Sequence, residues 1–104
     1  MVQQWFKANW GGNLILPDGW YGRPYDSQHA LTSVEECGST LIVVLDHKLT
    51  LRFEGLKSVK AQKSELIFGP FERLRFDWES FGTEGTRGTK EYQGGEVKIA
   101  SALR

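Results

Sequence analysis

This sequence of 104 residues contains only one cysteine, one methionine, two histidines and three prolines. The single cysteine, Cys37, excludes a disulfide within the chain and therefore a disulfide-stapled scaffold. The formal net charge is zero, because thirteen lysines and arginines balance thirteen aspartates and glutamates. Non-specific nucleic-acid binding needs a broad positive field, so we expect no nucleic-acid partner.

Long apolar runs are missing as well. No apolar run approaches eighteen residues, and no basic segment followed by an apolar one opens the sequence. We therefore expect no membrane association and a cytoplasmic location. The zero net charge leaves little repulsion between copies, and the edge strands of a short β domain need covering. We expect a homo-oligomer, for which a two-fold dimer is the simplest closed form.

The patterns of cofactor and metal sites are also absent from the sequence. Gly82, Gly85 and Gly88 recur at every third residue, but the Lys-Ser/Thr ending of a phosphate-binding loop does not follow. His29 and His47 lie eighteen positions apart, and no second cysteine supplements them as metal ligands. We therefore assign no cofactor, no metal site and no catalytic residue.

Apolar and aromatic residues are abundant by contrast. Hydrophobic residues make up 39% of the chain and aromatic residues 12%, including four tryptophans and six phenylalanines. This content is sufficient for the core of a folded domain, and the length is too short for two ordinary ones. We expect a single β domain over residues 1–104.

The strongest structural pattern is "TLIVVLDHKLTLRFEG", residues 40–55, where two β-rich runs flank the polar residues 46–48. This pattern predicts a hairpin. A three-residue loop places six large apolar side chains on one face, in the pairs Leu45–Leu49, Val43–Leu51 and Leu41–Phe53. We expect this face to be the core face. The first strand is apolar on both faces, which predicts the more central position for it.

A second hairpin is predicted in "ELIFGPFERLRFDW", residues 65–78, with its turn at Gly69 and Pro70. Its second strand places Leu74, Phe76 and Trp78 on the core face, and the alternate face carries charges that predict a solvated ladder. Weaker strands are expected at 13–16, 30–36, 58–62 and 96–100. Short strands separated by frequent turns predict an all-β fold, an antiparallel sandwich or small barrel of about seven strands.

The stretch "GTEGTRGTKEYQGG", residues 82–95, holds five glycines and three threonines with one large apolar residue, Tyr92. Such a segment cannot bury itself, and its glycines lose much entropy on ordering. We expect a mobile loop, or a loose hairpin arm that a partner orders.

The stretch "LPDGWYGRPYDSQH", residues 16–29, displays aromatic, charged and imidazole side chains on a backbone interrupted by Pro and Gly turns. Two interpretations remain open. The aromatic residues plug the open end of the fold while Arg23 pairs with Asp18 or Asp26, or they form a contact surface, for which Trp, Tyr and Arg are the preferred residues. The candidate ligand- or partner-binding residues are Asp18, Trp20, Tyr21, Arg23, Tyr25, Asp26 and His29.

Four further residues have simpler interpretations. His47 is expected at an exposed hairpin tip, because polar residues are the norm there. Cys37 is expected to be a half-buried inert thiol, since nothing near it in sequence lowers its pKa. Glu35 and Glu36 are adjacent on a strand and point to opposite faces, so they cannot act as an acid and base pair.

In three stretches the chain resembles a group of small bacterial proteins of unknown function and similar length. The resemblance is carried by "LPDGWYGRPYD", by "VVLDHKLTLRF" and by "FDWESFG". Members of this group look like stand-alone accessory proteins of the kind also carried on mobile gene cassettes. The resemblance implies the same fold and transfers no activity to any residue.

Two functions from different classes follow from the sequence. The first is a non-catalytic binding or interaction module that self-associates, because no nucleophile and base pair, metal cluster or cofactor motif occurs. The alternative is a small enzyme or small-molecule-binding β-barrel with a cleft near Arg23 and His29. The ligand in either case is an unidentified protein or small molecule.

Overall fold

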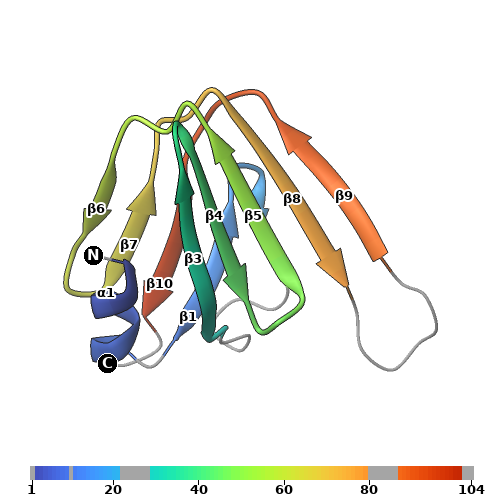
Figure 1. The fold of residues 1–104 in the computed structure, drawn as a ribbon. Coiled ribbons are helices and arrows are strands. Elements are labelled where there is room, and N and C mark those ends of the chain that lie inside the picture. The colour runs from blue at the N-terminus through green and yellow to red at the C-terminus, as the bar shows by residue number, and fades with distance from the viewer. Residues whose placement is uncertain (1, 10, 22–28, 80–86, 102–104) are drawn as a thin grey trace.

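The computed structural model describes residues 2–9, 11–21, 29–79 and 87–101. In this part of the chain, two antiparallel sheets of five strands each face one another as a sandwich, and the sheets do not close into a barrel (Figure 1). The elements are α1 (Val2–Asn9), β1 (Gly12–Leu16), β2 (Gly19–Trp20), β3 (Leu31–Cys37), β4 (Thr40–Leu45), β5 (Leu49–Glu54), β6 (Val59–Ala61), β7 (Glu65–Phe68), β8 (Arg73–Glu79), β9 (Arg87–Tyr92) and β10 (Val97–Ser101). The all-β antiparallel fold class is confirmed.

The first sheet has the order β2-β1-β10-β7-β6 and the second the order β3-β4-β5-β8-β9. The four weaker strands predicted from the sequence correspond to β1, β3, β6 and β10. The sequence analysis does not predict β2, β9 or α1. Two seams remain between the sheets. Edge strands β3 and β6 lie at one, where Val34 and Val59 line a common cavity, and β2 and β9 lie at the other, where Asp18 of the β1–β2 turn bonds to Tyr92.

The predicted hairpin over residues 40–55 is confirmed as β4 and β5, in the predicted register. The pairs are Leu45–Leu49, Val43–Leu51 and Leu41–Phe53, and all six side chains are buried. The expected central position of β4 is wrong, because β5 is the middle strand of the sheet. The outer face of β4 carries Ile42 and Val44, which are only half-buried, so apolar residues on both faces did not indicate the central strand.

The predicted hairpin over residues 65–78 is wrong. β7 pairs with β10 and β6 in one sheet, whereas β8 pairs with β5 and β9 in the other. The chain crosses between the sheets at Gly69, whose φ of 146° suits glycine, followed by a cis peptide bond to Pro70. Phe71 then enters the core and packs edge-on against Phe53, with ring centroids 5.5 Å apart. Alternation identifies the buried face of each strand but not the strand it pairs with.

Of the two alternatives for residues 82–95, the mobile loop is wrong for Arg87–Tyr92, which form β9 along the edge of β8. These residues match the hairpin arm, although β8 of the same chain orders them. Residues 82–86 lie outside the described residues. Gly88 is paired with Trp78, and the indole ring lies against the backbone of Gly88 where a Cβ atom would otherwise stand. The strand is therefore ordered by backbone pairing with β8 and by the Trp78 ring, although its own side chains are mostly small or polar.

Helix α1 closes part of the β3–β6 seam (Figure 1). Val2, Trp5 and Phe6 are buried, and their i, i+3, i+4 spacing is the sequence pattern that could have predicted this helix. The indole Nε1–H of Trp5 donates to the carbonyl oxygen of Gln62 at 2.8 Å, just beyond β6. The helix therefore attaches the N-terminal segment to the edge of the first sheet.

The core lies between the two inner faces. Phe53 and Phe68 come from different sheets and stack with ring centroids 5.0 Å apart and planes inclined by 13°. Leu74 and Phe76 are buried as predicted, whereas Trp78 is only half-buried at the end of the same face. No helix in the described part of the chain is long and apolar enough to cross a membrane.

Candidate functional site

The segment predicted to be a plug or a contact surface is described at its two ends only. Asp18, Tyr21 and His29 have described side chains, and Trp20 contributes its backbone to β2. The candidates Arg23, Tyr25 and Asp26 lie outside the described residues. The structure therefore tests the two interpretations at three of the seven candidate residues.

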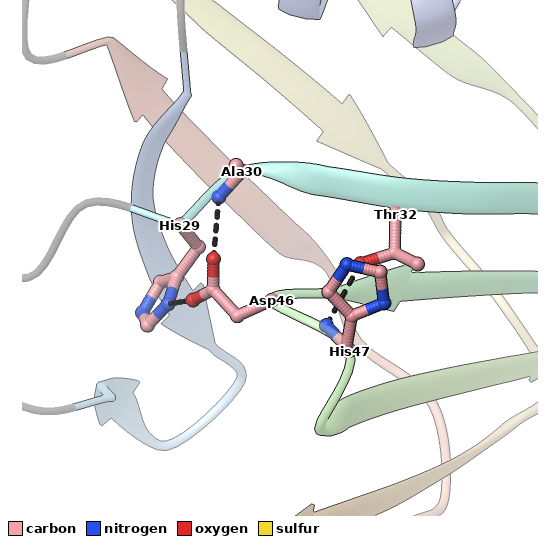
Figure 2. A network of polar contacts seen from close by, with 5 residues as sticks. All are labelled: His29, Ala30, Thr32, Asp46 and His47. Carbon is pink, nitrogen blue, oxygen red and sulfur yellow. Dashed lines mark hydrogen bonds and ion pairs between the residues drawn. The ribbon is translucent and has the colours of Figure 1, made fainter.

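His29 lies where the chain passes from one sheet to the other. Its backbone N–H and carbonyl both pair with Gly12 at the start of β1. The side chain is only 8% exposed, and its Nδ1–H donates to Oδ2 of Asp46 at 2.6 Å (Figure 2). Since a carboxylate only accepts hydrogen bonds, the proton of the neutral ring sits on Nδ1.

Asp46 and the turn that follows β4 are tied to β3 by further hydrogen bonds. Oδ1 of Asp46 accepts the backbone N–H of Ala30 at 2.8 Å, and the N–H of His47 donates to Oγ1 of Thr32 at 2.8 Å (Figure 2). Asp46 and His47 have φ angles of 53° and 58°, a conformation in which non-glycine residues are uncommon. His47 is exposed at the hairpin tip, as predicted. These contacts hold the turn against the start of β3.

The His29–Asp46 pair has the geometry of a general base and its orienting carboxylate. Nε2 of His29, the nitrogen that would accept a proton, is buried and has no hydrogen-bond partner among the described residues. Cys37 lies at the far end of β3 and is exposed, so the expectation that it is half-buried is wrong. A catalytic pair needs a nucleophile or substrate within hydrogen-bond reach of that nitrogen.

Tyr21 packs over this pair as a plug. Its ring meets Phe76 edge-on with centroids 5.2 Å apart, and lies 5.8 Å from the centroid of His29. Burial raises the pKa of the Tyr21 hydroxyl, because the charged phenolate is disfavoured away from water. At Tyr21 and His29, two of the predicted candidates, the packing supports the plug interpretation.

Asp18 instead joins the two sheets across the β2–β9 seam. Its Oδ1 accepts the hydroxyl of Tyr92 at 3.0 Å, and its Oδ2 lies 3.5 Å from Nζ of Lys90. The Tyr92 hydrogen bond lowers the pKa of Asp18, assisted by the Lys90 charge, against a smaller effect of burial in the opposite direction. Burial, together with the bond to Asp18, raises the pKa of Tyr92 to about 12. The described partners of Asp18 are thus on β9.

Beside this contact the β2–β9 seam opens into a cavity of about 240 Å³, which we call the aromatic cleft. Its lining residues are Leu16, Tyr21, Phe76, Trp78 and Lys90. Only Tyr21 was among the predicted candidates, because Phe76 and Trp78 were placed on the core face and therefore interpreted as core residues. The pairing of Trp78 with Gly88 leaves the indole ring at the edge, where it forms a wall of the cleft.

The outer face of β8 carries the predicted charge ladder. Nε of Arg73 lies 2.8 Å from Oε2 of Glu54, and Oδ1 of Asp77 accepts the Thr89 hydroxyl at 2.5 Å and approaches Nε of Arg75 at 3.4 Å. These cross-strand contacts are those of a solvated sheet face. The described residues contain no group of three His, Cys, Asp or Glu side chains placed to hold a metal ion.

A scan against protein-family models, a search of curated proteins and a search of solved structures find no match for this chain. The resemblance to small bacterial accessory proteins therefore stays a prediction.

Proposed function

We propose that this protein is a non-catalytic binding module that holds a small ring-bearing molecule in the aromatic cleft. The observation that carries this proposal is a cavity of about 240 Å³ between the sheets, walled by Tyr21, Phe76 and Trp78. Ligand sites are concave, mostly apolar and equipped with a few convergent polar groups. Aromatic walls favour a planar ring, which can stack on them or meet them edge-on.

The polar group at the cleft suggests the charge of the ligand. Lys90 lies at the rim, and its ammonium group is paired with Asp18 at 3.5 Å. Both side chains are more than half exposed, at 56% and 54%, so this ion pair is weak and can exchange one partner for another. A ring-bearing molecule with a carboxylate or other anionic group therefore fits the cleft best.

The buried Nε2 of His29 supports binding over catalysis. A small enzyme with its cleft near Arg23 and His29 is the alternative predicted from the sequence, and Arg23 lies outside the described residues. His29 does not line the aromatic cleft. In this proposal the His29–Asp46 pair supports the floor of the site through Tyr21, and it transfers no proton.

A thermal-shift screen against a metabolite library tests the proposal. A ligand present at 100 times its Kd adds about 2.7 kcal/mol of stability, which raises the Tm of a domain of this size by several degrees. We expect the molecules that do so to be anionic ring compounds. Trp78→Leu should abolish the shift and Lys90→Ala should reduce it, whereas Lys7→Ala, at an exposed lysine of α1, should leave it unchanged.

Two results would contradict the proposed site. One is a complete screen in which anionic ring compounds leave the Tm unchanged. The other is a ligand whose Tm shift survives in Trp78→Leu, because that ligand would bind elsewhere on the chain.

Self-association is a separate part of the proposed function. Its support is a zero net charge together with the edge strands that end both sheets. Sedimentation at micromolar concentration should give a species larger than the 11.8 kDa chain. A single 11.8 kDa species would exclude this part and leave the binding cleft unaffected.

A further inference from the structure

The seam opposite the aromatic cleft, between β3 and β6, has the features of an interface. Beyond α1 it holds a cavity of about 380 Å³, whose lining includes Val2, Val34, Leu41 and Val59. Val34 and Val59 are only half-buried, so this apolar floor is partly open to water. Glu36 lies at the same cavity, at the edge of the floor.

The two edge strands that border this seam carry opposite charges. Glu35 and Glu36 lie near the end of β3, both exposed, and β6 has Lys60 exposed at its centre. No ion pair within the described part of the chain involves any of these three residues. Their charges are therefore available to a partner that presents the reverse pattern.

The faces on which these charges lie follow from the sheet registers. Val34 pairs with the buried Val43, so Val34 faces inward and the adjacent Glu35 faces outward. In the other sheet, Lys60 pairs with Ile67, which lies between the buried Leu66 and Phe68, so Lys60 also faces outward. Each edge therefore has an apolar inner side and a charged outer side.

A second copy of this chain presents the complementary pattern. β3 and β6 run in opposite directions (Figure 1). A two-fold axis in the plane of the interface and parallel to the strands would set β3 of one copy against β6 of the other, antiparallel, twice per dimer. Rotation about such an axis keeps each residue at its own height along the strands. Val34 and Val59 line one cavity, so they lie near one another within a copy, and the rotation keeps their difference in height across the interface.

We propose that the protein forms a two-fold dimer through the β3–β6 seam. This inference rests on the self-association in the proposed function and names the surface responsible. Val34 and Val59 form the apolar centre of the interface. Because β3 and β6 run in opposite directions, Glu35 of each copy lies diagonally from Lys60 of the other on the outer faces, a separation that these long side chains span. Edge strands β3 and β6 are thereby covered, which removes the exposed edges that favour aggregation.

Charge reversal tests this proposal by sedimentation equilibrium. Glu35→Lys and Lys60→Glu each place like charges together at two points in the dimer, so each should weaken dimerisation by roughly tenfold or more. The double variant Glu35→Lys/Lys60→Glu restores opposite charges in reversed order, and should recover most of the lost affinity. Added salt should weaken the wild-type dimer and strengthen either single variant.

Glu91→Lys is the matched control, because Glu91 is an exposed acid on edge strand β9, at the far seam. It should leave the dimer unchanged. All three positions are exposed, so the Tm of each of the four variants at low protein concentration should stay near that of the wild type, which separates a lost interface from a lost fold.

The outcomes distinguish this proposal from the proposed function. A wild-type chain that sediments only as a monomer overturns self-association and this interface together, and leaves the aromatic cleft to its own screen. A dimer that withstands both single reversals, or that the double variant does not restore, overturns the interface alone. A metabolite that fills the β3–β6 cavity while the chain stays monomeric would also overturn it.

Discussion

The two histidines of the chain differ in every contact that matters for stability. His29 is buried, bonded to Asp46 and packed beneath Tyr21, whereas His47 stands exposed at a hairpin tip. His29→Ala leaves Oδ2 of Asp46 without its donor and opens a cavity under Tyr21, so we expect a loss of about 2–3 kcal/mol in the free energy of unfolding. His47→Ala should change it by less than about 0.5 kcal/mol. Urea denaturation of the two variants provides the comparison, and equal effects would contradict the structural role of His29.

Position 88 requires a glycine because of the neighbouring Trp78 ring and not because of its own backbone conformation. A Cβ atom at this position would overlap ring atoms of Trp78. We expect Gly88→Ala to displace the indole ring and to lower the free energy of unfolding by about 1–3 kcal/mol, the usual cost of overpacking. Tryptophan fluorescence should shift as the ring moves.

A double-mutant cycle separates this clash from any effect on β9 itself. In a Trp78→Ala background the ring is absent, so Gly88→Ala should have almost no further effect on stability. If Gly88→Ala is equally costly with and without the ring, the glycine serves the strand instead.

At the scale of elements, Val43 and Val44 test the register of β4. Val43 is fully buried opposite Leu51, and Val44 lies half-buried on the outer face opposite Thr50. Val43→Asp buries an unpaired charge and should cost several kcal/mol, enough to unfold a small domain. Val44→Asp should keep the fold, with a cost of about 1 kcal/mol. Circular dichroism and Tm measure both, and a folded Val43→Asp variant would refute the face assignment.

The strands that could be predicted from the sequence are those whose pattern is local. The pairing of β4 with β5 depends on alternation over twelve residues and on a three-residue turn, all within one stretch of chain. One partner of β7 is β10, which lies some thirty residues later in the chain. No local pattern in the sequence indicates this pairing. β9 escaped prediction because its order comes from β8 and from the Trp78 ring, not from its own glycine- and threonine-rich sequence.

The hydrogen bond from the Tyr92 hydroxyl of β9 to Asp18 of the β1–β2 turn acts as a clamp between the sheets. This clamp should make stability depend on pH at both ends of the scale. The pKa of Asp18 is lowered in the folded state, so its contribution is present above about pH 4 and lost as the carboxylate is protonated. The pKa of Tyr92 is raised to about 12, so its contribution is present below about pH 10 and lost as the pH rises toward 12.

Tyr92→Phe removes this clamp, and we expect a loss of about 1 kcal/mol at neutral pH, because Asp18 is exposed and water competes for the bond. The difference in unfolding free energy between the wild type and Tyr92→Phe should be level from about pH 5 to 9 and shrink on either side. Urea denaturation across this range measures it. A difference that stays constant from pH 3 to pH 11 would show that Tyr92 contributes by packing alone.

At the scale of the whole molecule, the candidate site arises where distant segments meet. The aromatic cleft combines residues of β1, β8 and β9 with Tyr21. The sequence predicted only Tyr21, because it alone of these residues is an aromatic side chain in the turn-rich stretch 16–29. Phe76 and Trp78 follow one alternating pattern, yet one is buried and the other half-exposed. That difference arises because β8 extends to a seam, which depends on the order of strands in both sheets.

The two seams lie on opposite edges of the sandwich, which predicts that ligand binding and dimerisation are independent. The aromatic cleft lies between β2 and β9, the proposed interface lies between β3 and β6, and three strands of each sheet separate them. Changes at separate sites with no shared contacts add in free energy. Trp78→Leu should therefore abolish the ligand-induced Tm shift and leave the sedimentation of the dimer unchanged. Lys60→Glu should weaken the dimer and leave the ligand-induced Tm shift unchanged.

Titration of the ligand at protein concentrations above and below the dimer dissociation constant should give one Kd. Two Kd values would mean that the core transmits a change between the seams, because a ligand that favours the dimer must bind the dimer more tightly.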